Sequence, residues 1–409
     1  MSTVPLAAGF VLPHDAEHEV VERKGLGHPD TLADGIAELA SIRYAQYCLD
    51  EFGAVLHHNL DKVAVFGGCV AFGAVDGRYV RPLRVVFGGR ASSSFAGRLV
   101  PVREILSAAA REHLHAALPG YERVVLDVRV DTTDSSKFPF WFTPRGVEDL
   151  PERTRVRCND TAYLVGVAPR TRAEVIALLT EAWLADQPWS GSDIKVLVAR
   201  HHQRFAVTVC VPALAGRVGS AVEFRALLTT AEKSLTELVH DHTPEEIEVE
   251  FRCNTGEDSA SEGPLSAQYF TVSGSAVDYG EDGLVGRGNF RHGLISPAYA
   301  VGNEVSFGKN PTYHVGKVGG WLSDHAAAAL AQVAGPCRVG VAWRIGADYD
   351  DPVTLHVTTR NPGHHRDAQL RVRQALTERD WLPELVEGQR YRPEVGALGE
   401  LLGELARAH

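Results

Sequence analysis

The stretch KGLGHPDTLADGIAELA, residues 24–40, joins a glycine turn to the start of an amphipathic helix. Pro29 suits the first helical turn, while Asp30 and Thr31 suit early-turn or capping positions. One interpretation is a capped helix with His28 on the surface. The other is an anion site, in which His28 and backbone N–H groups face a phosphate and Asp30 binds a hard divalent cation. The pattern alone leaves both interpretations open.

The composition is that of an ordinary soluble globular protein, with 409 residues, 44% hydrophobic and 23% charged. The formal net charge of −11 argues against a nucleic-acid surface, which needs a basic stripe. No apolar run has the length of a membrane span, and the N-terminal segment lacks the basic region of a signal peptide. The six cysteines are scattered without a C-x-x-C pair. We therefore expect a reduced, cytoplasmic protein without a zinc module.

Strand-like and helical patterns follow one another with roughly two strands to each helix, which favours α+β domains. We expect mixed or antiparallel sheets with helices on one face. Neither a Rossmann G-x-G-x-x-G nor a Walker G-x-x-x-x-G-K-[ST] motif occurs. Helices are predicted at 29–53, 101–118, 172–187, 221–242, 321–335 and 365–386, and strands within 61–75, 79–90, 122–130, 194–213, 246–255, 267–276, 337–345 and 352–360. The expected domains are 1–140, 141–265 and 266–409, with the chain weaving between them.

Two further glycine-rich stretches carry cationic side chains. In YGEDGLVGRGNF, residues 279–290, the glycines let backbone approach a ligand and Arg287 can fork two phosphate oxygens. In SFGKNPTYHVGKV, residues 306–318, Lys309, His314 and Lys317 form a plausible anion cradle within one glycine-bounded loop. Loops with incidental, solvated charge are the alternative for both stretches.

Shorter polar stretches add amide and acid groups. They are HHNLD (57–61), CND (158–160) and GSDIKV (191–196), and Lys195 in the last of them begins an apolar strand. Together these stretches offer an acid for Mg²⁺, several cations and several glycine turns. That set suits a polyphosphate substrate such as ATP, bound without Walker chemistry.

The motifs VERKGLGHPDTLADGIAE, LHHNLD, NDTAYLVGVAP, DIKV, EDGLVGRGN…HGLISP and GKNPTYHVGK, in this order, resemble the archaeal-type S-adenosylmethionine synthetase family. The resemblance runs from about residue 19 to about residue 320. It implies three α+β domains related by pseudo-threefold symmetry and a homodimer with active sites at the subunit interface. It also implies the conversion of ATP and L-methionine to S-adenosylmethionine, phosphate and diphosphate. Mg²⁺ is the implied cofactor, with K⁺ left open as a second.

The resemblance also implies a role for individual residues. His28 contacts the oxygen that bridges C5′ and the α-phosphate, and Asp30 holds Mg²⁺ with Glu22 within reach of a cation. Lys195, Arg287 and Lys309 complete the catalytic set, and His314 and Lys317 line the triphosphate. The groups expected to bind methionine or adenosine are Asn159, Asp160, Asp282 and Asn289.

Three departures from the family pattern concern the specificity for the amino-acid substrate. Leu60 and Cys69 stand where the family usually has polar residues, and the loop 131–145 reads DTTDSSKFPFWFTPR instead of a Gly/Gln/Ser loop. Two alternatives therefore stay open. One is a same-fold paralogue that transfers adenosyl to another nucleophile or cleaves triphosphate from ATP. The other is a nucleotide-binding subunit without catalysis.

Overall fold

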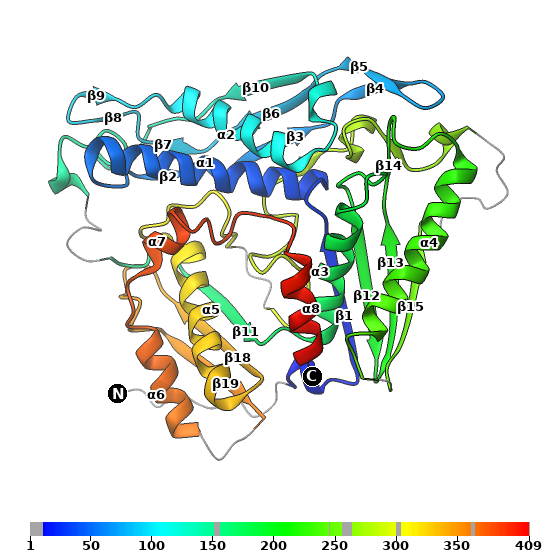
Figure 1. The fold of residues 1–409 in the computed structure, drawn as a ribbon. Helices are drawn as coiled ribbons and strands as arrows, with labels where there is room; N and C mark the ends of the chain where they lie inside the picture. Colours follow the sequence, from blue (N-terminus) through cyan, green and yellow to red (C-terminus); the bar gives the residue numbers. More distant parts are fainter. Residues whose placement is uncertain are drawn as a thin grey trace.

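The computed structural model describes residues 11–150, 156–244, 246–255, 264–299, 304–360 and 365–408. The chain forms three helix-covered sheets, which Figure 1 shows around a common centre. Each sheet contains an antiparallel pair of strands flanked in sequence by helices. No helix in the described ranges has the length and apolar character needed to cross a membrane.

The first repeat is a helix, an antiparallel strand pair, a second helix and a strand that pairs in parallel with the second strand of the pair. Strand β10 lies parallel to β6, and β6 lies antiparallel to β3. Helices α1 and α2 pack against each other over a core that contains Leu32, Ile36, Val85 and Phe87. The elements are α1 (Pro29–Phe52), β3 (Val63–Phe66), β6 (Leu83–Phe87), α2 (Val102–Ala117) and β10 (Leu126–Val130).

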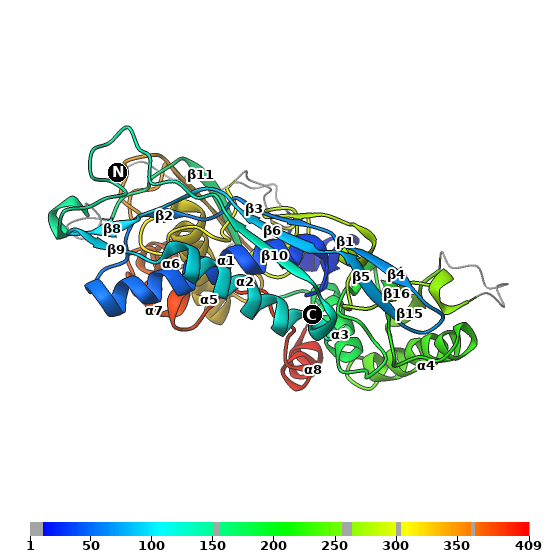
Figure 2. The ribbon, with the colours of Figure 1, turned by 90° about the horizontal axis from the view of Figure 1, so that it is seen from above.

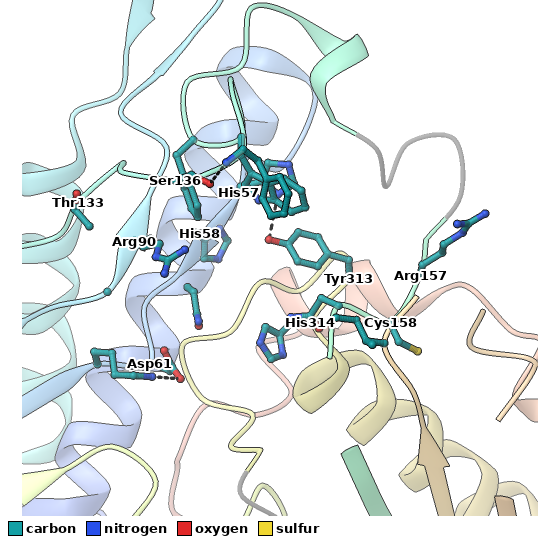
Figure 3. Close-up of a pocket in the computed structure, with 18 of the residues that line it drawn as sticks. His57, His58, Asp61, Arg90, Thr133, Ser136, Arg157, Cys158, Tyr313 and His314 are labelled. Carbon is teal, nitrogen blue, oxygen red and sulfur yellow. Dashed lines mark hydrogen bonds and ion pairs between the residues drawn. The ribbon is translucent and has the colours of Figure 1, made fainter. Parts of the chain in front are cut away.

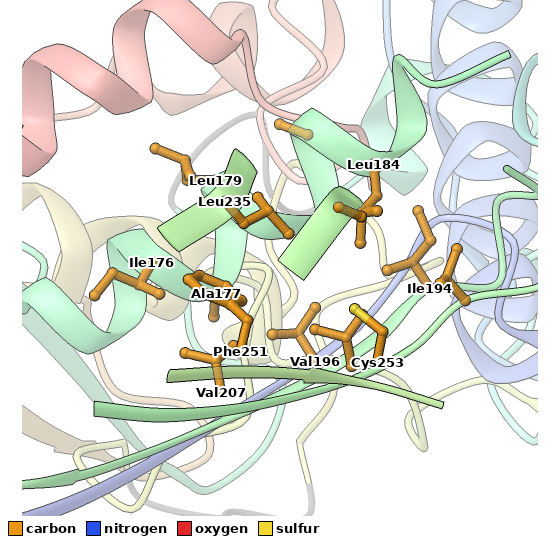
Figure 4. Packing of buried hydrophobic residues seen from close by; sticks show 14 of the residues in the cluster. Ile176, Ala177, Leu179, Leu184, Ile194, Val196, Val207, Leu235, Phe251 and Cys253 are labelled. Atoms are coloured by element: carbon orange, nitrogen blue, oxygen red, sulfur yellow. The ribbon is translucent and has the colours of Figure 1, made fainter. Parts of the chain in front are cut away.

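The second repeat has the same order and pairing. Strand β12 pairs antiparallel with β13, which pairs parallel with β15. Buried side chains of the two helices, among them Ile176 and Leu235, pack over Val196, Val207 and Phe251 of the sheet (Figure 4). The elements are α3 (Arg172–Ala185), β12 (Lys195–His201), β13 (Arg204–Cys210), α4 (Ala221–His240) and β15 (Glu248–Cys253).

The third repeat keeps the helix, the strand pair and the second helix, and its described sheet contains no strand equivalent to β10 or β15. Its elements are α5 (Val315–Ala334), β18 (Cys337–Trp343), β19 (Thr354–Thr359) and α6 (His365–Ala375). Helix α7 (Trp381–Val386) follows it, and α8 (Leu398–Arg407) returns to pack on α3. The repeated order confirms the expected pseudo-threefold α+β fold.

The three repeats are interlocked by edge strands that the chain exchanges between them. The strand before each first helix joins the sheet of another repeat: β1 (His18–Lys24) precedes α1 but pairs with β12, and β11 (Ala162–Ala168) precedes α3 but pairs with β18. Strand β17 (Gly283–Leu284) precedes α5 and pairs with β3, which closes the cycle. The sequence pattern did not predict β1 or β11 as strands. Because sheets do not follow consecutive segments, the boundaries at 140 and 265 stay predictions.

The sheets of the first two repeats have a face covered by helices and a face left open by this chain, whereas β18 of the third sheet is buried on both faces. Side chains alternate strictly along β13, buried on one face and exposed on the other. Figure 2 shows sheets along one side of the molecule and α3, α4 and α8 on the other. Large apolar side chains are exposed in these strands: Val20 is 47% exposed, Leu197 38% and Phe66 37%. Exposed apolar side chains on an open sheet face are typical of a surface that another chain covers.

Most helix ends agree with the predicted ranges, but two of the six predicted ranges differ from the structure. Helix α5 begins at Val315, six residues before the predicted start at 321. Lys317 therefore lies in the first turn of a helix, and the prediction that it belongs to a glycine-bounded loop is wrong. The run 365–386 is also not one helix, because α6 ends at Ala375 and α7 begins at Trp381.

A stripe of carboxylates on α1 anchors the two glycine-rich segments. Asp30 and Asp34 accept hydrogen bonds from the backbone N–H groups of Leu284 (3.1 Å) and Gly286 (2.7 Å). One turn further along, Glu38 accepts from Gly308 (3.0 Å). Residues 30, 34 and 38 are four apart, so they lie on one helix face. Glycines permit the approach, since a Cβ at 283 would meet the Pro29 carbonyl oxygen.

The stripe ends in a buried ion pair. The ammonium of Lys317 lies 2.7 and 2.6 Å from the two carboxylate oxygens of Glu38, and the two side chains are 1% and 0% exposed. Burial lowers the pKa of Lys317, although the Glu38 charge opposes the shift. Because neither charge can reach water, each one depends on the other.

We predict that Lys317→Met lowers the free energy of unfolding by about 3–5 kcal/mol, because it leaves the Glu38 carboxylate buried and unpaired. Urea denaturation measures this loss. The double variant Lys317→Met/Glu38→Gln should recover a large part of it, since glutamine can still accept from Gly308. Lys233→Ala, which breaks the exposed 3.8 Å pair with Glu237, is the matched control. A loss below about 1 kcal/mol for Lys317→Met would contradict the structural role of the pair.

Candidate active site

His28 is the N-cap of α1. Its Nδ1 accepts a hydrogen bond from the Asp30 backbone N–H at 3.2 Å, so in the neutral ring Nε2 carries the proton. Burial and the nearby Lys24 ammonium lower the pKa of His28 to about 4, against the opposing effect of Asp30. At neutral pH the helix N-terminus therefore presents an uncharged N–H donor. His28 is partly exposed and itself caps α1, so the helix cap is present and the anion site stays a prediction.

Two carboxylates lie near His28, and each forms an ion pair with a lysine. Asp30 is buried and lies 3.0 Å from the Lys24 ammonium, while Glu22 lies 3.1 Å from the ammonium of Lys195. Lys195 and Glu22 come from the paired strands β12 and β1. The two lysines occupy positions next to carboxylate oxygen, where a cation is electrostatically favoured. No group of three or more His, Cys, Asp or Glu side chains suited to a metal occurs in the described part of the chain.

The segment 282–289 completes this first cluster. The Asn289 side chain accepts from the Lys24 backbone N–H (2.9 Å) and donates to the Lys24 carbonyl (2.7 Å), which fixes the end of β1. The Asp282 carboxylate accepts from the backbone N–H of Gly67 at 2.9 Å. The Arg287 side chain is exposed, and its carbonyl accepts from the Lys24 ammonium at 2.6 Å. We refer to Glu22, Lys24, His28, Asp30, Lys195, Asp282, Arg287 and Asn289 as the His28 cluster.

A second cluster surrounds the start of α5. His314 is the N-cap, and its Nδ1 accepts from the Gly316 backbone N–H at 3.2 Å, as His28 does in the first repeat. Burial and the Lys309 charge lower the pKa of His314 well below its ordinary value. The Lys309 ammonium is buried between the carboxylates of Asp61 (2.9 Å) and Glu304 (3.1 Å). Burial opposes the ionisation of Asp61, but Lys309 and Lys62 outweigh it and lower its pKa.

The remaining predicted residues lie near this second cluster. Asn159 accepts from the Val315 backbone N–H at 2.9 Å and so helps to cap α5. Asp160 is exposed and accepts from the backbone N–H of Thr161. Lys317 points into the ion pair with Glu38. We refer to Asn159, Lys309 and His314, with the carboxylates of Asp61 and Glu304, as the His314 cluster.

The twelve predicted site residues therefore fall into two groups within one chain. Ser41 on α1 donates to the Lys309 carbonyl at 2.9 Å, which places the His314 cluster beside this part of the helix. Asp30 and Ser41 are eleven residues apart, about 16 Å along the helix axis. The charges with the largest effects on the pKa of His28 are those of Lys24, Asp30, Lys195 and Glu22, all in the first group. One chain thus holds the two groups apart.

A cavity of about 740 Å³ adjoins the His314 cluster (Figure 3). Its wall includes Asn159 and His314, Asp61 and several residues of the 131–145 loop. Cys158 also lines it, and burial raises the pKa of that thiol to about 12, so the thiol is protonated at neutral pH. Cys69 lies in the hairpin of β4 (Cys69–Phe72) and β5 (Gly77–Arg81) and does not line this cavity. The volume is within the range of small-molecule sites.

Aromatic rings form one wall of the cavity. The Trp141 ring lies 5.1 Å from Phe138 and 4.8 Å from His57, measured between centroids. His57 lies 5.3 Å from Tyr313, whose hydroxyl is 3.1 Å from His57 Nδ1. Figure 3 shows the Tyr313 hydroxyl pointing at His57 across the cavity. We refer to Phe138, Trp141, His57 and Tyr313 as the aromatic wall.

Several residues that organise both clusters were not predicted. They are Lys24, Asp34, Glu38 and Glu304, while Asp61 was noted only as part of a polar stretch. The carboxylates at 30, 34 and 38 did carry a signal, since three acids at spacing four on a helix that is otherwise apolar are unusual. Glu304 carried none, because its partner Lys309 is five residues away in a loop.

Comparison with known proteins identifies the protein family of this chain. A family model described as S-adenosylmethionine synthetase (AdoMet synthetase) matches residues 10–385. The chain belongs to this family. The S-adenosylmethionine synthase of Haloarcula marismortui is 34% identical, over 86% of this chain and 87% of that protein. That of Thermoplasma volcanium is 33% identical, over 91% and 94%.

Two further similarities extend the comparison. An uncharacterized protein of Streptococcus pyogenes serotype M3 is 34% identical over 86% of this chain and 88% of its own. A solved structure titled an unusual S-adenosylmethionine synthetase from Campylobacter jejuni covers 95% of this chain and 99% of its own, with a TM-score of 0.59 and 15% identity. At that identity the likeness shows the fold.

We predict that acid destabilises the protein below pH 6.5 because buried histidines are neutral in the folded state. Burial lowers the pKa of His28 and His57 to about 4, and of His58 and His113 to about 3. The unfolded chain takes up these protons first, so stability is present above pH 6.5 and is lost as pH falls toward 4. Each histidine contributes a slope of about 1.4 kcal/mol per pH unit.

Urea denaturation at pH 7.5, 6 and 5 measures this slope. His113→Leu should reduce the slope by one proton, since both ring nitrogens of His113 are buried without a hydrogen-bond partner in the described structure. His115→Asn, at a histidine side chain that is 67% exposed, is the control on the same helix. Stability that stays constant from pH 7.5 to 5 would contradict the prediction.

Proposed function

We propose that this protein synthesises S-adenosylmethionine from ATP and L-methionine. The observation that carries the proposal is the His28 N-cap, an uncharged N–H donor at a helix N-terminus with lysines beside it. The oxygen that leaves C5′ of ATP develops negative charge, and such a donor stabilises it without first losing hydrogen bonds to water. Family membership and the archaeal synthases that match most of the chain support the same reaction.

The proposed chemistry needs no general base. A lone pair of the methionine sulfur forms the bond to C5′, and the electrons of the C5′–O bond leave with the triphosphate. Sulfur becomes a sulfonium, and the triphosphate is hydrolysed to phosphate and diphosphate before release. Lys195, Arg287 and Lys309 are proposed to bind the triphosphate, with His314 beside them. Holding the sulfur in line with C5′ contributes the rest of the rate enhancement.

Asp30 and Glu22 fit a Mg²⁺ ion that is held partly by substrate phosphates. Mg²⁺ in nucleotide sites commonly takes one or two protein carboxylates, and both groups here already face a cationic ammonium. When bound, the ion would neutralise phosphate charge. The role of Lys317 in binding the triphosphate stays a prediction, since its ammonium is paired with Glu38. K⁺ and the cytoplasmic location stay predictions.

We further propose that a complete site forms between two copies of the chain. The positions on α1 beside the two clusters, Asp30 and Ser41, lie about 16 Å apart along the helix axis of one chain, which is too far for a single triphosphate to contact both positions closely. Glu22 and Lys195 lie on strands whose open face also carries exposed Val20 and Leu197. A second copy covering this face would bring its His314 cluster toward the first copy's His28 cluster.

The 131–145 loop supports a second candidate, adenosyl transfer to a nucleophile other than methionine, because its aromatic residues line the cavity. A purely nucleotide-sensing subunit is less well supported, since sensing does not require a cluster of cations at the leaving group.

We predict that the purified protein, with ATP, Mg²⁺ and methionine, forms the sulfonium product, and that His28→Asn lowers kcat by about 100-fold or more. Mass spectrometry and coupled phosphate release measure both. Asparagine is a good N-cap, so the helix start is retained while the Nε2–H donor is lost. ATP affinity should change much less than kcat.

Near-normal turnover of His28→Asn would show that the histidine only caps the helix. Triphosphate or adenosine products without a sulfonium would instead favour the alternative in which ATP is cleaved or another nucleophile is used.

A further inference from the structure

We propose that Lys24 is a positioning residue for the proposed reaction. Its ammonium joins the start of α1 to the segment 284–289, and this contact orients Arg287 toward the triphosphate. The inference rests on the proposed function, in which Arg287 binds the triphosphate. Lys24 is not assigned as a ligand, because it acts through the backbone of the segment that carries Arg287.

The Arg287 side chain has no anchor of its own. It is exposed, and within the described ranges its guanidinium forms no hydrogen bond or ion pair. Gly286 precedes it with a φ of +85°, in the left-handed region that glycine adopts readily. The direction of the guanidinium therefore depends on how firmly the backbone at 287 is held.

Lys24 holds this backbone through three hydrogen bonds. Its ammonium donates to the Arg287 carbonyl at 2.6 Å. Its own backbone N–H donates to the Asn289 side chain at 2.9 Å, and its carbonyl accepts from the same side chain at 2.7 Å. One residue at the end of β1 thus binds positions 287 and 289 together.

The place of Lys24 in the sheet makes it a fixed reference point. Strand β1 pairs with β12 along its whole length, and the residue directly opposite Lys24 is Lys195. Lys195 and Arg287 are both proposed to bind the triphosphate, although they lie far apart in the sequence. Because Lys24 contacts the segment of one and lies opposite the other, it sets the separation between the two cations.

The Asp30 carboxylate completes the connection to α1. One of its oxygens lies 3.0 Å from the Lys24 ammonium, and the other accepts from the Leu284 backbone N–H at 3.1 Å. The lysine and aspartate side chains are only 16% and 9% exposed, so the pair is screened less by water than a surface pair. Asp30 and the Arg287 carbonyl together engage two of the three N–H donors of the ammonium. This occupancy favours positioning over direct phosphate binding.

Loss of the Lys24 ammonium would have two separable effects. It removes a positive charge near the triphosphate, which acts whether or not Arg287 is present. It also releases the backbone at 287, which acts only through Arg287. A double-mutant cycle separates these effects, because only the second makes the two changes non-additive.

The test compares wild type, Lys24→Met, Arg287→Ala, the double variant and Lys24→Arg. Calorimetry with inorganic triphosphate and Mg²⁺ gives the affinity, and sulfonium formation from ATP and methionine gives kcat. Lys233→Met is the matched control, since this lysine side chain is 78% exposed on α4. Urea denaturation establishes that each variant is folded, and Lys24→Gln replaces Lys24→Met in the cycle if Lys24→Met does not fold.

We expect Lys24→Met to weaken triphosphate binding and to lower kcat by about tenfold each, and Arg287→Ala to do at least as much. The double variant should match Arg287→Ala within about twofold, because Lys24 has nothing left to orient. Lys24→Arg should stay within about threefold of wild type, since its guanidinium can donate to both the carbonyl and the carboxylate. Lys233→Met should behave as wild type.

Two results would overturn the inference. If the effects of Lys24→Met and Arg287→Ala on triphosphate affinity multiply, Lys24 acts independently of Arg287. If Arg287→Ala leaves the affinity unchanged, there is no ligand for Lys24 to position. The proposed function is judged separately, since a wild type that binds triphosphate but forms no sulfonium contradicts that function while the cycle in affinity still decides the role of Lys24.

Discussion

The carboxylates at 30, 34 and 38 on α1 are the constraint on which the candidate site depends. They are short acceptors on one helix face, and they bind the backbone of two segments that come about 250 residues later in the chain. The glycine-rich segments have few side chains of their own to pack, so backbone hydrogen bonds to these acids hold them in place. The same helix begins at His28 and passes Lys309. It therefore fixes the distance between the two clusters.

Pseudo-threefold symmetry explains why two histidines have the same role. His28 and His314 cap the first helices of the first and third repeats, and both use Nδ1 as the acceptor. In the second repeat this position is Thr171, which forms a capping box with Glu174. The proposed chemistry uses this difference in polarity along the molecule. Cations surround the His28 cap, where the proposed leaving group needs them, and aromatic rings line the cavity beside the His314 cap.

The fold class could be predicted from sequence because local patterns determine its helices and strand pairs. Helix α1 was predicted within one residue of its observed end at Phe52. Strands β1 and β11 were not predicted, since each is an edge strand supplied to another repeat and its partner lies more than 150 residues away. The start of α5 was missed because Gly316, Gly319 and Gly320 resemble a loop. These glycines allow close packing, as a Cβ at 319 would meet Trp343.

For the candidate site, the sequence indicated residue types better than their arrangement. Motif resemblance pointed to His28, Lys195 and Lys309, and the structure places His28 at the start of α1, Lys195 on β12 and Lys309 in the segment that precedes α5. The sequence did not indicate that Lys317 forms an ion pair with Glu38, or that the Asn289 side chain forms hydrogen bonds with the end of β1. Such partners are set by tertiary packing, which no spacing along the chain reveals.

The most direct test of the central claim, that one chain carries two halves of separate sites, is the turnover of a heterodimer. One chain carries His28→Asn, the other Lys309→Met, and the mixed dimer is purified through two different tags. If sites form between chains, one of the two sites contains both changes and the other is intact, so about half of wild-type turnover returns although each variant alone is inactive. A heterodimer as inactive as both parents would contradict the account, because it would place the two clusters in one site within one chain.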